Sequence, residues 1–97
     1  MPVVHIPALL HSLTAGVRQQ ALTGTTVAEL IDQLDALYPG IKSRLVAGDR
    51  LRPGLAVFVD GLVRREGLKF EVSPESEVHF IPAVAGGGLR PPLTART

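Results

Sequence analysis

Residues 26–40 carry the strongest structural signal in the chain: Thr26-Val27-Ala28-Glu29-Leu30-Ile31-Asp32-Gln33-Leu34-Asp35-Ala36-Leu37-Tyr38-Pro39-Gly40. Thr26 and Glu29 have the spacing of a capping box, in which both side chains accept hydrogen bonds from free amides at a helix start. Pro39-Gly40 ends the pattern, because proline cannot continue the hydrogen-bond ladder and glycine accepts a left-handed turn. The stretch therefore predicts one helix from Thr26 to Tyr38. Its buried stripe is expected to contain Val27, Leu30, Ile31, Leu34, Leu37 and Tyr38.

Short apolar segments separated by turn residues flank this helix on both sides. Asp60-Gly61 suits a tight hairpin, and Pro7 and Pro82 each close an apolar run that is typical of a strand. We expect strands at 3–6, 17–22, 55–59, 62–64, 70–72 and 78–81. The order of a hairpin, one long helix and further strands predicts an α+β domain whose helix packs across one sheet.

The composition limits the classes of protein that the chain can represent. Its 97 residues, 45% of them hydrophobic, suffice for one small domain. The absence of cysteine excludes disulfides, thiolate metal sites and a cysteine nucleophile. A net charge of +1 without a basic run argues against nucleic acid as a partner. With no apolar run of membrane-spanning length and no signal-peptide pattern, we expect no membrane partner and a cytoplasmic location.

The body of the sequence lacks a catalytic constellation. His5, His11 and His79 are far apart and do not have the spacing of a metal site. Asp32 and Asp35 share the polar side of the predicted helix, where carboxylates are usually only solvated. We therefore expect no catalytic residue and no metal site in this chain.

The C-terminal segment Ile81-Pro82-Ala83-Val84-Ala85-Gly86-Gly87-Gly88 has a different character. A strand that runs into small residues makes a slender arm, which at ~3.4 Å per residue extends roughly 20 Å from Pro82 to Gly87. Because glycine has no Cβ, such an arm can pass a narrow channel and present an unhindered carboxylate. Judged by residue content alone, the same segment also fits a flexible tail or linker.

The segment Phe80-Ile81-Pro82-Ala83-Val84-Ala85-Gly86-Gly87 closely resembles the C-terminus of the ThiS/MoaD family of ubiquitin-like sulfur carriers, which ends in a diglycine. The resemblance covers about residues 3–87. It extends to 26–30 and 38–41 at the two ends of the helix and to 57–61 in the central strand. The opening Ile6-Pro7-Ala8-Leu9-Leu10 is most similar to the cysteine-biosynthetic, CysO-type branch.

This resemblance implies a β-grasp fold, a mixed sheet packed on one main helix, over residues 1–85. It also implies a carrier rather than an enzyme. In such a family, a ubiquitin-activating-type adenylating enzyme uses ATP and Mg to adenylate the terminal glycine, here Gly87. Conversion to a covalent thiocarboxylate and sulfur transfer to a sulfur-accepting synthase would follow. Ala83, Val84, Ala85 and Gly86 would form the arm that enters the partner, and the chain itself would bind no cofactor.

The chain departs from the family at its end, because it continues through Gly88 to Thr97. We expect residues 86–97 to form a tail whose extension, 88–97, is removed by a zinc-dependent JAMM-type peptidase that cuts after Gly87. Cleavage after Gly88 is the nearby alternative. A functionless remnant at the terminus is a further interpretation of the extension.

Two further interpretations concern docking and function. Phe58, Phe80 and Pro82 are expected to form an exposed apolar patch near the arm, although apolar strand residues also belong to cores. For function, the alternatives are the small subunit of a molybdopterin synthase, a ubiquitin-like protein modifier and a passive interaction module. The sulfur donor and the final acceptor cannot be predicted from the residues.

Overall fold

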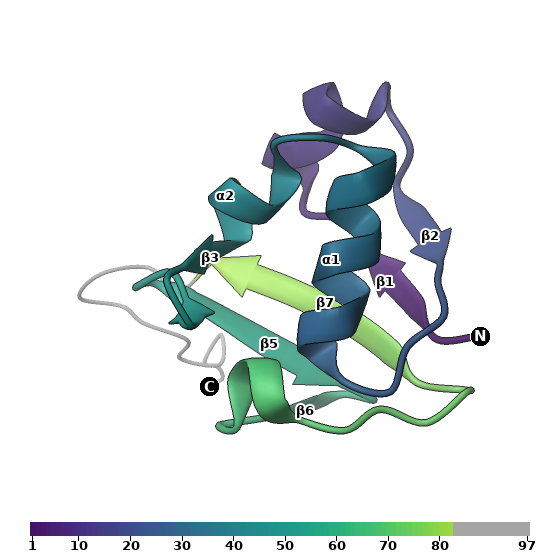
Figure 1. Ribbon diagram of the computed structural model, residues 1–97, viewed down its shortest axis with the longest axis vertical. Coiled ribbons are helices and arrows are strands. Elements are labelled where there is room, and N and C mark those ends of the chain that lie inside the picture. Colours follow the sequence, from purple (N-terminus) through teal and green to yellow (C-terminus); the bar gives the residue numbers. More distant parts are fainter. Residues whose placement is uncertain (83–97) are drawn as a thin grey trace, which may run out of the picture.

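The computed structural model describes residues 1–82, and it contains one five-stranded mixed sheet with a helix across it (Figure 1). The strand order is β2-β1-β7-β5-β6. β1 and β7 run parallel to each other, and the other neighbours in the sheet are antiparallel. The strands of this sheet are β1 (Val3–His5), β2 (Gln19–Ala21), β5 (Leu55–Val59), β6 (Leu62–Val63) and β7 (Glu77–Pro82).

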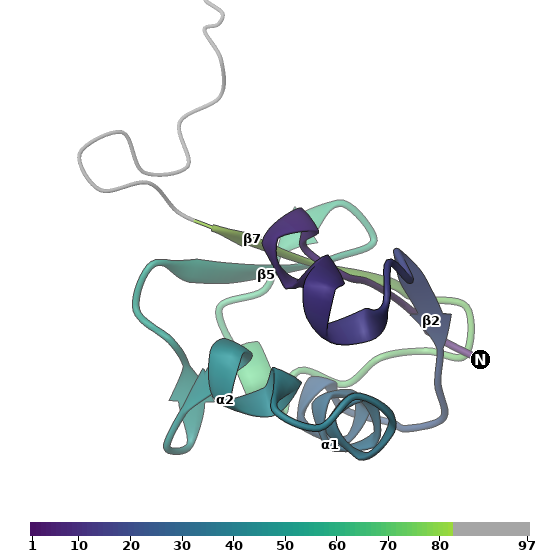
Figure 2. The same ribbon diagram turned by 90° about the horizontal axis from the view of Figure 1, so that it is seen from above.

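The remaining elements connect or cover this sheet. The main helix is α1 (Val27–Leu37), followed at once by the short α2 (Ile41–Leu45), and both lie on one side of the sheet (Figure 2). A small hairpin of β3 (Val46–Ala47) and β4 (Arg50–Leu51) comes next. Two 3-10 helices, η1 (Ala8–Thr14) and η2 (Gly67–Lys69), occupy connections between strands. The predicted α+β class with a mixed sheet and one main helix is confirmed.

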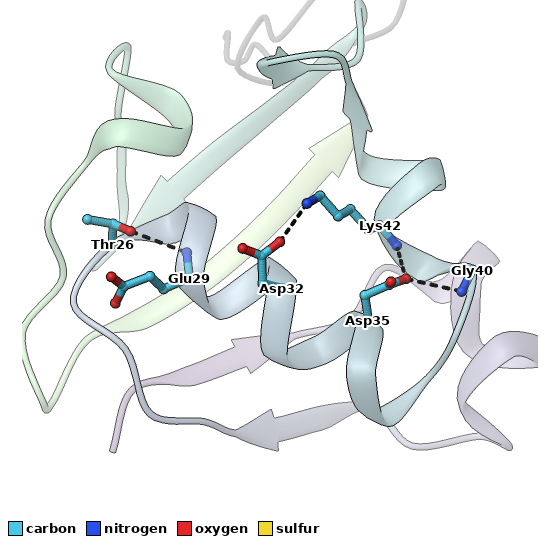
Figure 3. Close-up of polar contacts among 6 residues, drawn as sticks. All are labelled: Thr26, Glu29, Asp32, Asp35, Gly40 and Lys42. Carbon is cyan, nitrogen blue, oxygen red and sulfur yellow. Dashed lines mark hydrogen bonds and ion pairs between the residues drawn. The ribbon is translucent and has the colours of Figure 1, made fainter.

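α1 begins where the capping pattern predicts. The Thr26 hydroxyl accepts a hydrogen bond from the Glu29 amide at 3.2 Å (Figure 3). The Glu29 carboxylate accepts from the Thr25 amide at 2.7 Å, one residue earlier than in the usual capping box. The buried side of the helix consists of Val27, Leu30, Ile31 and Leu34. Leu37, expected on the same stripe, is instead 53% exposed at the last residue of the helix, and Tyr38 is half-buried.

The corner between α1 and α2 is held by Asp35. One carboxylate oxygen of Asp35 accepts hydrogen bonds from the backbone amides of Gly40, at 3.1 Å, and Lys42, at 3.0 Å (Figure 3). Gly40 adopts φ +99°, which a residue with a Cβ rarely reaches. Lys42 Nζ donates to Asp32 at 2.6 Å. The two aspartates of the polar helix side therefore have structural partners.

Replacing Asp35 with alanine is expected to destabilise the protein, because two backbone amides lose their common acceptor. The expected loss is about 1 kcal/mol of unfolding free energy, the usual effect of removing a capping side chain. Urea denaturation measures it. Asp32→Ala is the matched control, since it removes only an exposed ion pair and should leave the unfolding midpoint nearly unchanged. Equal midpoints for the two variants would contradict the role given to Asp35.

Four connections and strands differ from the sequence-based expectation. Residues 70–72 do not form a sheet strand. Their backbone bonds the start of α1 instead, with Val27 N donating to Phe70 O at 3.0 Å and Val72 N donating to Thr25 O at 2.9 Å. The predicted strand at 17–22 is limited to β2, and η1 precedes it. The β3–β4 pairing at 46–51 was not among the expected strands.

The core lies between α1 and the sheet. Alternate strand residues face the helix, and Val4, Val57, Val59, Val78 and Phe80 are all buried. Residues on the opposite side of the same strands remain accessible: Val3, His5, Phe58 and His79 are half-buried, and Ile81 is 37% exposed. One side of the sheet thus makes the core, and the other is an open sheet face. Within residues 1–82, no helix has the length and hydropathy required to span a bilayer.

Candidate functional site

The chain leaves the sheet from β7, which lies between β1 and β5. β7 is paired on both sides, to β1 over three residues and to β5 over five, up to the pair Leu55–Pro82. Proline suits the last position of a strand because it has no amide to donate. The pairing of β7 with both neighbouring strands therefore fixes the direction in which the chain leaves the sheet at Pro82.

The residues expected to carry the chemistry follow Pro82 directly. The predicted arm, Ala83, Val84, Ala85 and Gly86, lies outside the described residues. The same is true of Gly87, the expected site of adenylation, and of Gly88, the alternative cleavage position. What the structure contributes is the place where this segment begins and the surfaces around it.

The expected docking patch is not one surface. Phe80 is 3% exposed and packs in the core, so its assignment to an exposed patch is wrong. The register explains the error, because Phe80 pairs with Val57 whereas Phe58 pairs with His79. Neighbouring residues of a strand point to opposite faces. Phe58 consequently lies on the open sheet face, and Pro82 is exposed at the end of β7.

The open sheet face also carries a cluster that the sequence analysis did not find. The rings of His5 and His79 stack with their centroids 4.0 Å apart and their planes inclined by 3°. His5 Nε2 lies 2.9 Å from a carboxylate oxygen of Glu77. The parallel register of β1 and β7 places His5 directly beside His79, although 73 residues separate them in the chain. The similar segments Val4-His5-Ile6 and Val78-His79-Phe80 were the available signal.

The third histidine has a different environment. His11 Nε2 lies 2.8 Å from the carbonyl oxygen of Ile6, which ties η1 to the end of β1. No group of three or more histidine or carboxylate side chains suited to a metal ion occurs within residues 1–82. The geometry therefore gives His11 a structural contact.

The environment of His79 makes the stability of the fold depend on pH. Partial burial lowers the pKa of His79, nearby His5 lowers it further, and Glu77 opposes both. The folded protein thus binds the His79 proton less readily than the unfolded chain does. The resulting stabilisation is complete above the unfolded pKa of about 6.5 and is lost as the pH falls through the lower folded value.

We expect the unfolding free energy to decrease between pH 7 and pH 5, and His79→Gln to reduce that decrease. Urea denaturation at a series of pH values gives both slopes. A variant whose slope equals that of the unchanged protein would assign the pH dependence to other groups.

Comparisons with known proteins agree with the observed fold. The sequence matches the family model described as the ThiS family over residues 4–87. The sulfur carrier protein CysO of Mycobacterium tuberculosis H37Rv is 35% identical over 91 residues, which cover 87% of this chain and 96% of that protein.

Solved structures give the same result. The crystal structure of the Amycolatopsis orientalis BexX/CysO complex contains a chain that matches with a TM-score of 0.82 and 36% identity, covering 90% of this chain and 100% of that one. Small archaeal modifier protein 1 of Methanosarcina acetivorans matches with a TM-score of 0.72 and 26% identity, covering 89% and 95%.

These relatives confirm the ubiquitin-like β-grasp and a sulfur carrier role. The CysO protein, which the chain matches over most of its length, is a sulfur carrier protein rather than an enzyme. The family match extends over 84 of the 97 residues and includes the start of the fold, the helix and the diglycine. The chain therefore belongs to the ThiS family of ubiquitin-like sulfur carrier proteins.

Proposed function

We propose that the carboxylate of Gly87 is the sulfur-bearing group of this carrier. The observation that carries the proposal is that the family match ends at Gly87 and leaves residues 88–97 outside it. The arm begins at the end of β7, which is hydrogen-bonded to a strand on each side. A firmly held strand gives the arm a fixed starting point, and this supports the proposal. Residues 1–85 would act as the carrier domain.

The reaction would proceed in two steps on a partner. In the first, a carboxylate oxygen of Gly87 attacks the α-phosphorus of ATP held with Mg by an adenylating enzyme of the ubiquitin-activating type, and pyrophosphate leaves. In the second, sulfur at the level of hydrosulfide, whatever its donor, attacks the carbonyl carbon and AMP leaves, which yields the thiocarboxylate. The absence of a Cβ in Gly86 and Gly87 keeps the arm thin enough to reach such a site. The carrier domain contributes recognition and the reacting carboxylate.

Processing must come first, because the encoded chain has no carboxylate at Gly87. We infer that a JAMM-type zinc peptidase cuts after Gly87, with cleavage after Gly88 as the neighbouring possibility. Removal of 88–97 takes away Arg90 and Arg96 and no acidic residue. The mature carrier would therefore be more negative than its precursor by two charges.

The thiocarboxylate would then pass its sulfur to a synthase that forms cysteine or another sulfur-containing metabolite. Complex formation by a CysO chain with BexX supports the idea that such carriers dock on other proteins. On this chain, the proposed partner contacts are Phe58, on the open sheet face beside His79, and Pro82, which is exposed at the end of β7 where the arm begins. We expect these steps to take place in the cytoplasm.

A protein modifier is the second candidate, and the likeness to small archaeal modifier protein 1 favours it. In that case the same activated glycine would be joined to lysines of target proteins. The chain has only two lysines of its own, Lys42 and Lys69, and Lys42 pairs with Asp32. Isopeptide-linked conjugates in a lysate of the native cell would support this candidate.

Intact mass spectrometry of the untagged protein from its native cell tests the proposed function. We expect a chain that ends at Gly87, with a fraction made heavier by the exchange of one oxygen for sulfur. A chain ending at Gly88 would move the reactive position by one residue. Finding only the 97-residue chain, under conditions in which the pathway is active, would contradict the proposal.

A further inference from the structure

A groove of about 500 Å³ lies beside the end of β7, where the chain leaves the sheet. Its apolar lining comes from the start of η1, from α2 and from the paired ends of β5 and β7. Leu10 and Leu45 are buried in it, whereas Pro82 is exposed at its edge. We call this the exit groove, and its apolar residues are Pro7, Leu9, Leu10, Leu45, Leu55 and Pro82.

The exit groove exposes apolar surface that the fold does not use. Leu9 is 73% exposed, the largest value among the exposed large hydrophobic residues of the described chain. It stands on η1, a connection whose own packing relies on Leu10 and Thr14. Contiguous exposed apolar surface with a polar border is typical of an interaction site. Leu9 is thus free to contact a partner without any loss to the core.

Two arginines give the exit groove a positive border. Arg44 belongs to α2, and Arg52 follows β4. Arg52 Nε donates to the carbonyl oxygen of Ser43 at 2.8 Å, which holds the guanidinium group beside the groove. Within residues 1–82, neither arginine has a carboxylate within 4.0 Å, and no aspartate or glutamate lines the groove. The border can therefore accept carboxylates from outside.

This charge excludes the nearest internal candidate. Residues 83–97 contain Arg90 and Arg96 and no acidic residue, so like charges would oppose their binding in the groove. A second copy of the chain offers exposed carboxylates such as Asp49, so self-association is an outcome that the test distinguishes. The position of the groove, at the point where the chain leaves the sheet, favours the enzyme that would take the arm.

We infer that the exit groove binds a segment of the adenylating enzyme that presents an apolar side chain next to carboxylates. This inference rests on the proposed function, which requires such an enzyme to take the arm that starts at Pro82. Contact at the groove would fix the base of the arm while its end enters the active site. Apolar contact with Leu9 would supply affinity, and the two arginines would supply charge complementarity and faster association.

The test measures binding of the full-length chain to the adenylating enzyme from the same organism, without ATP, by calorimetry. Arg44→Glu with Arg52→Glu should weaken binding roughly tenfold, because attraction is replaced by repulsion at two positions. Arg18→Glu with Arg65→Glu is the matched control, since it makes the same change of charge at exposed residues outside the groove and should stay within about twofold. The groove effect should diminish as salt is added.

A second pair of variants tests the apolar part. Leu9→Ser should weaken binding several-fold, whereas Leu62→Ser, at a residue that is 59% exposed on β6, should not. Both leucines are exposed, so neither change removes a core contact. Circular dichroism should show all four variants folded at the temperature of the binding experiment, with a slightly lower midpoint for the variant that loses the hydrogen bond from Arg52 to Ser43.

The possible results separate the groove from the proposed function. Equal binding by the Arg44→Glu/Arg52→Glu variant and its control would overturn the inference. Adenylation of a chain ending at Gly87 would then still leave the proposed function intact. Groove-dependent binding without adenylation of the chain ending at Gly87 would support the inference and contradict the proposed function. Absence of binding by the unchanged chain would overturn the inference. Self-association of the chain that is abolished by Arg44→Glu with Arg52→Glu would also overturn it.

Discussion

A chain that ends at Gly87 is expected to support ATP–pyrophosphate exchange by the adenylating enzyme, whereas the 97-residue chain should not. In the full-length chain the Gly87 carbonyl is part of a peptide bond, so no oxygen is available to attack the α-phosphorus. The expected difference in exchange rate is at least about a hundredfold, since the nucleophile itself is missing. Initial rates at equal carrier concentration measure it.

Two further lengths make this comparison specific. A chain ending at Leu93 is shorter than the encoded one but lacks a glycine carboxylate, and it should be as inactive as the full chain. A chain ending at Gly88 has a glycine carboxylate placed one residue further along. Faster exchange by that chain than by the one ending at Gly87 would assign the reactive position to Gly88. Equal exchange by the 97-residue chain and the chain ending at Gly87 would contradict the need for processing.

The part of the fold that could be predicted from the sequence is the part whose signals are local. At α1, the Thr26 cap, the apolar stripe and the stop at Pro39-Gly40 all indicate the same element, and the structure agrees within one or two residues. The hairpin at Asp60-Gly61 is similar, because both residues adopt positive φ, +54° and +86°. Such elements depend on few contacts beyond their own residues.

The misses arise from contacts between distant residues. Phe70-Glu71-Val72 has the composition of a strand, yet its backbone bonds the start of α1, which no pattern within the segment indicates. η1 has neither a capping side chain nor an acidic first turn, so nothing in the sequence marks its start. The pairing of His5 with His79 requires β1 to lie parallel to β7. The alternation of apolar and polar residues predicts the two faces of each strand. It does not predict which strands lie side by side.

The same limit applies to the candidate site. Gly86-Gly87 and the small residues before it could be proposed from the sequence, because the proposed chemistry would need a thin arm with a terminal glycine. The neighbouring surfaces could not. Leu9 and Pro82 are far apart in the chain and become neighbours only when β1 and β7 are paired and η1 packs at their ends. Arg44 and Arg52 likewise join the exit groove through α2 and the β3–β4 hairpin.

Phe80→Ala is expected to have the largest effect on stability among the single changes considered. Phe80 is 3% exposed and lies in the central strand β7, among the buried valines of β1 and β5. Removing a buried phenylalanine ring leaves a cavity and typically costs about 3–5 kcal/mol. That is a large fraction of the total for a domain of this size. Urea denaturation should show a much lower midpoint with the same slope.

Phe58→Ala is the matched control, because Phe58 occupies the neighbouring strand but points to the open sheet face. Its side chain is half-buried, so its loss should cost only about 1 kcal/mol. The order of the two effects should be reversed when binding to the adenylating enzyme is measured under conditions in which both variants are folded. Phe58→Ala should weaken binding to the adenylating enzyme, whereas Phe80→Ala should leave it unchanged. Weaker binding by Phe80→Ala at full folding would return Phe80 to the docking surface and contradict its assignment to the core.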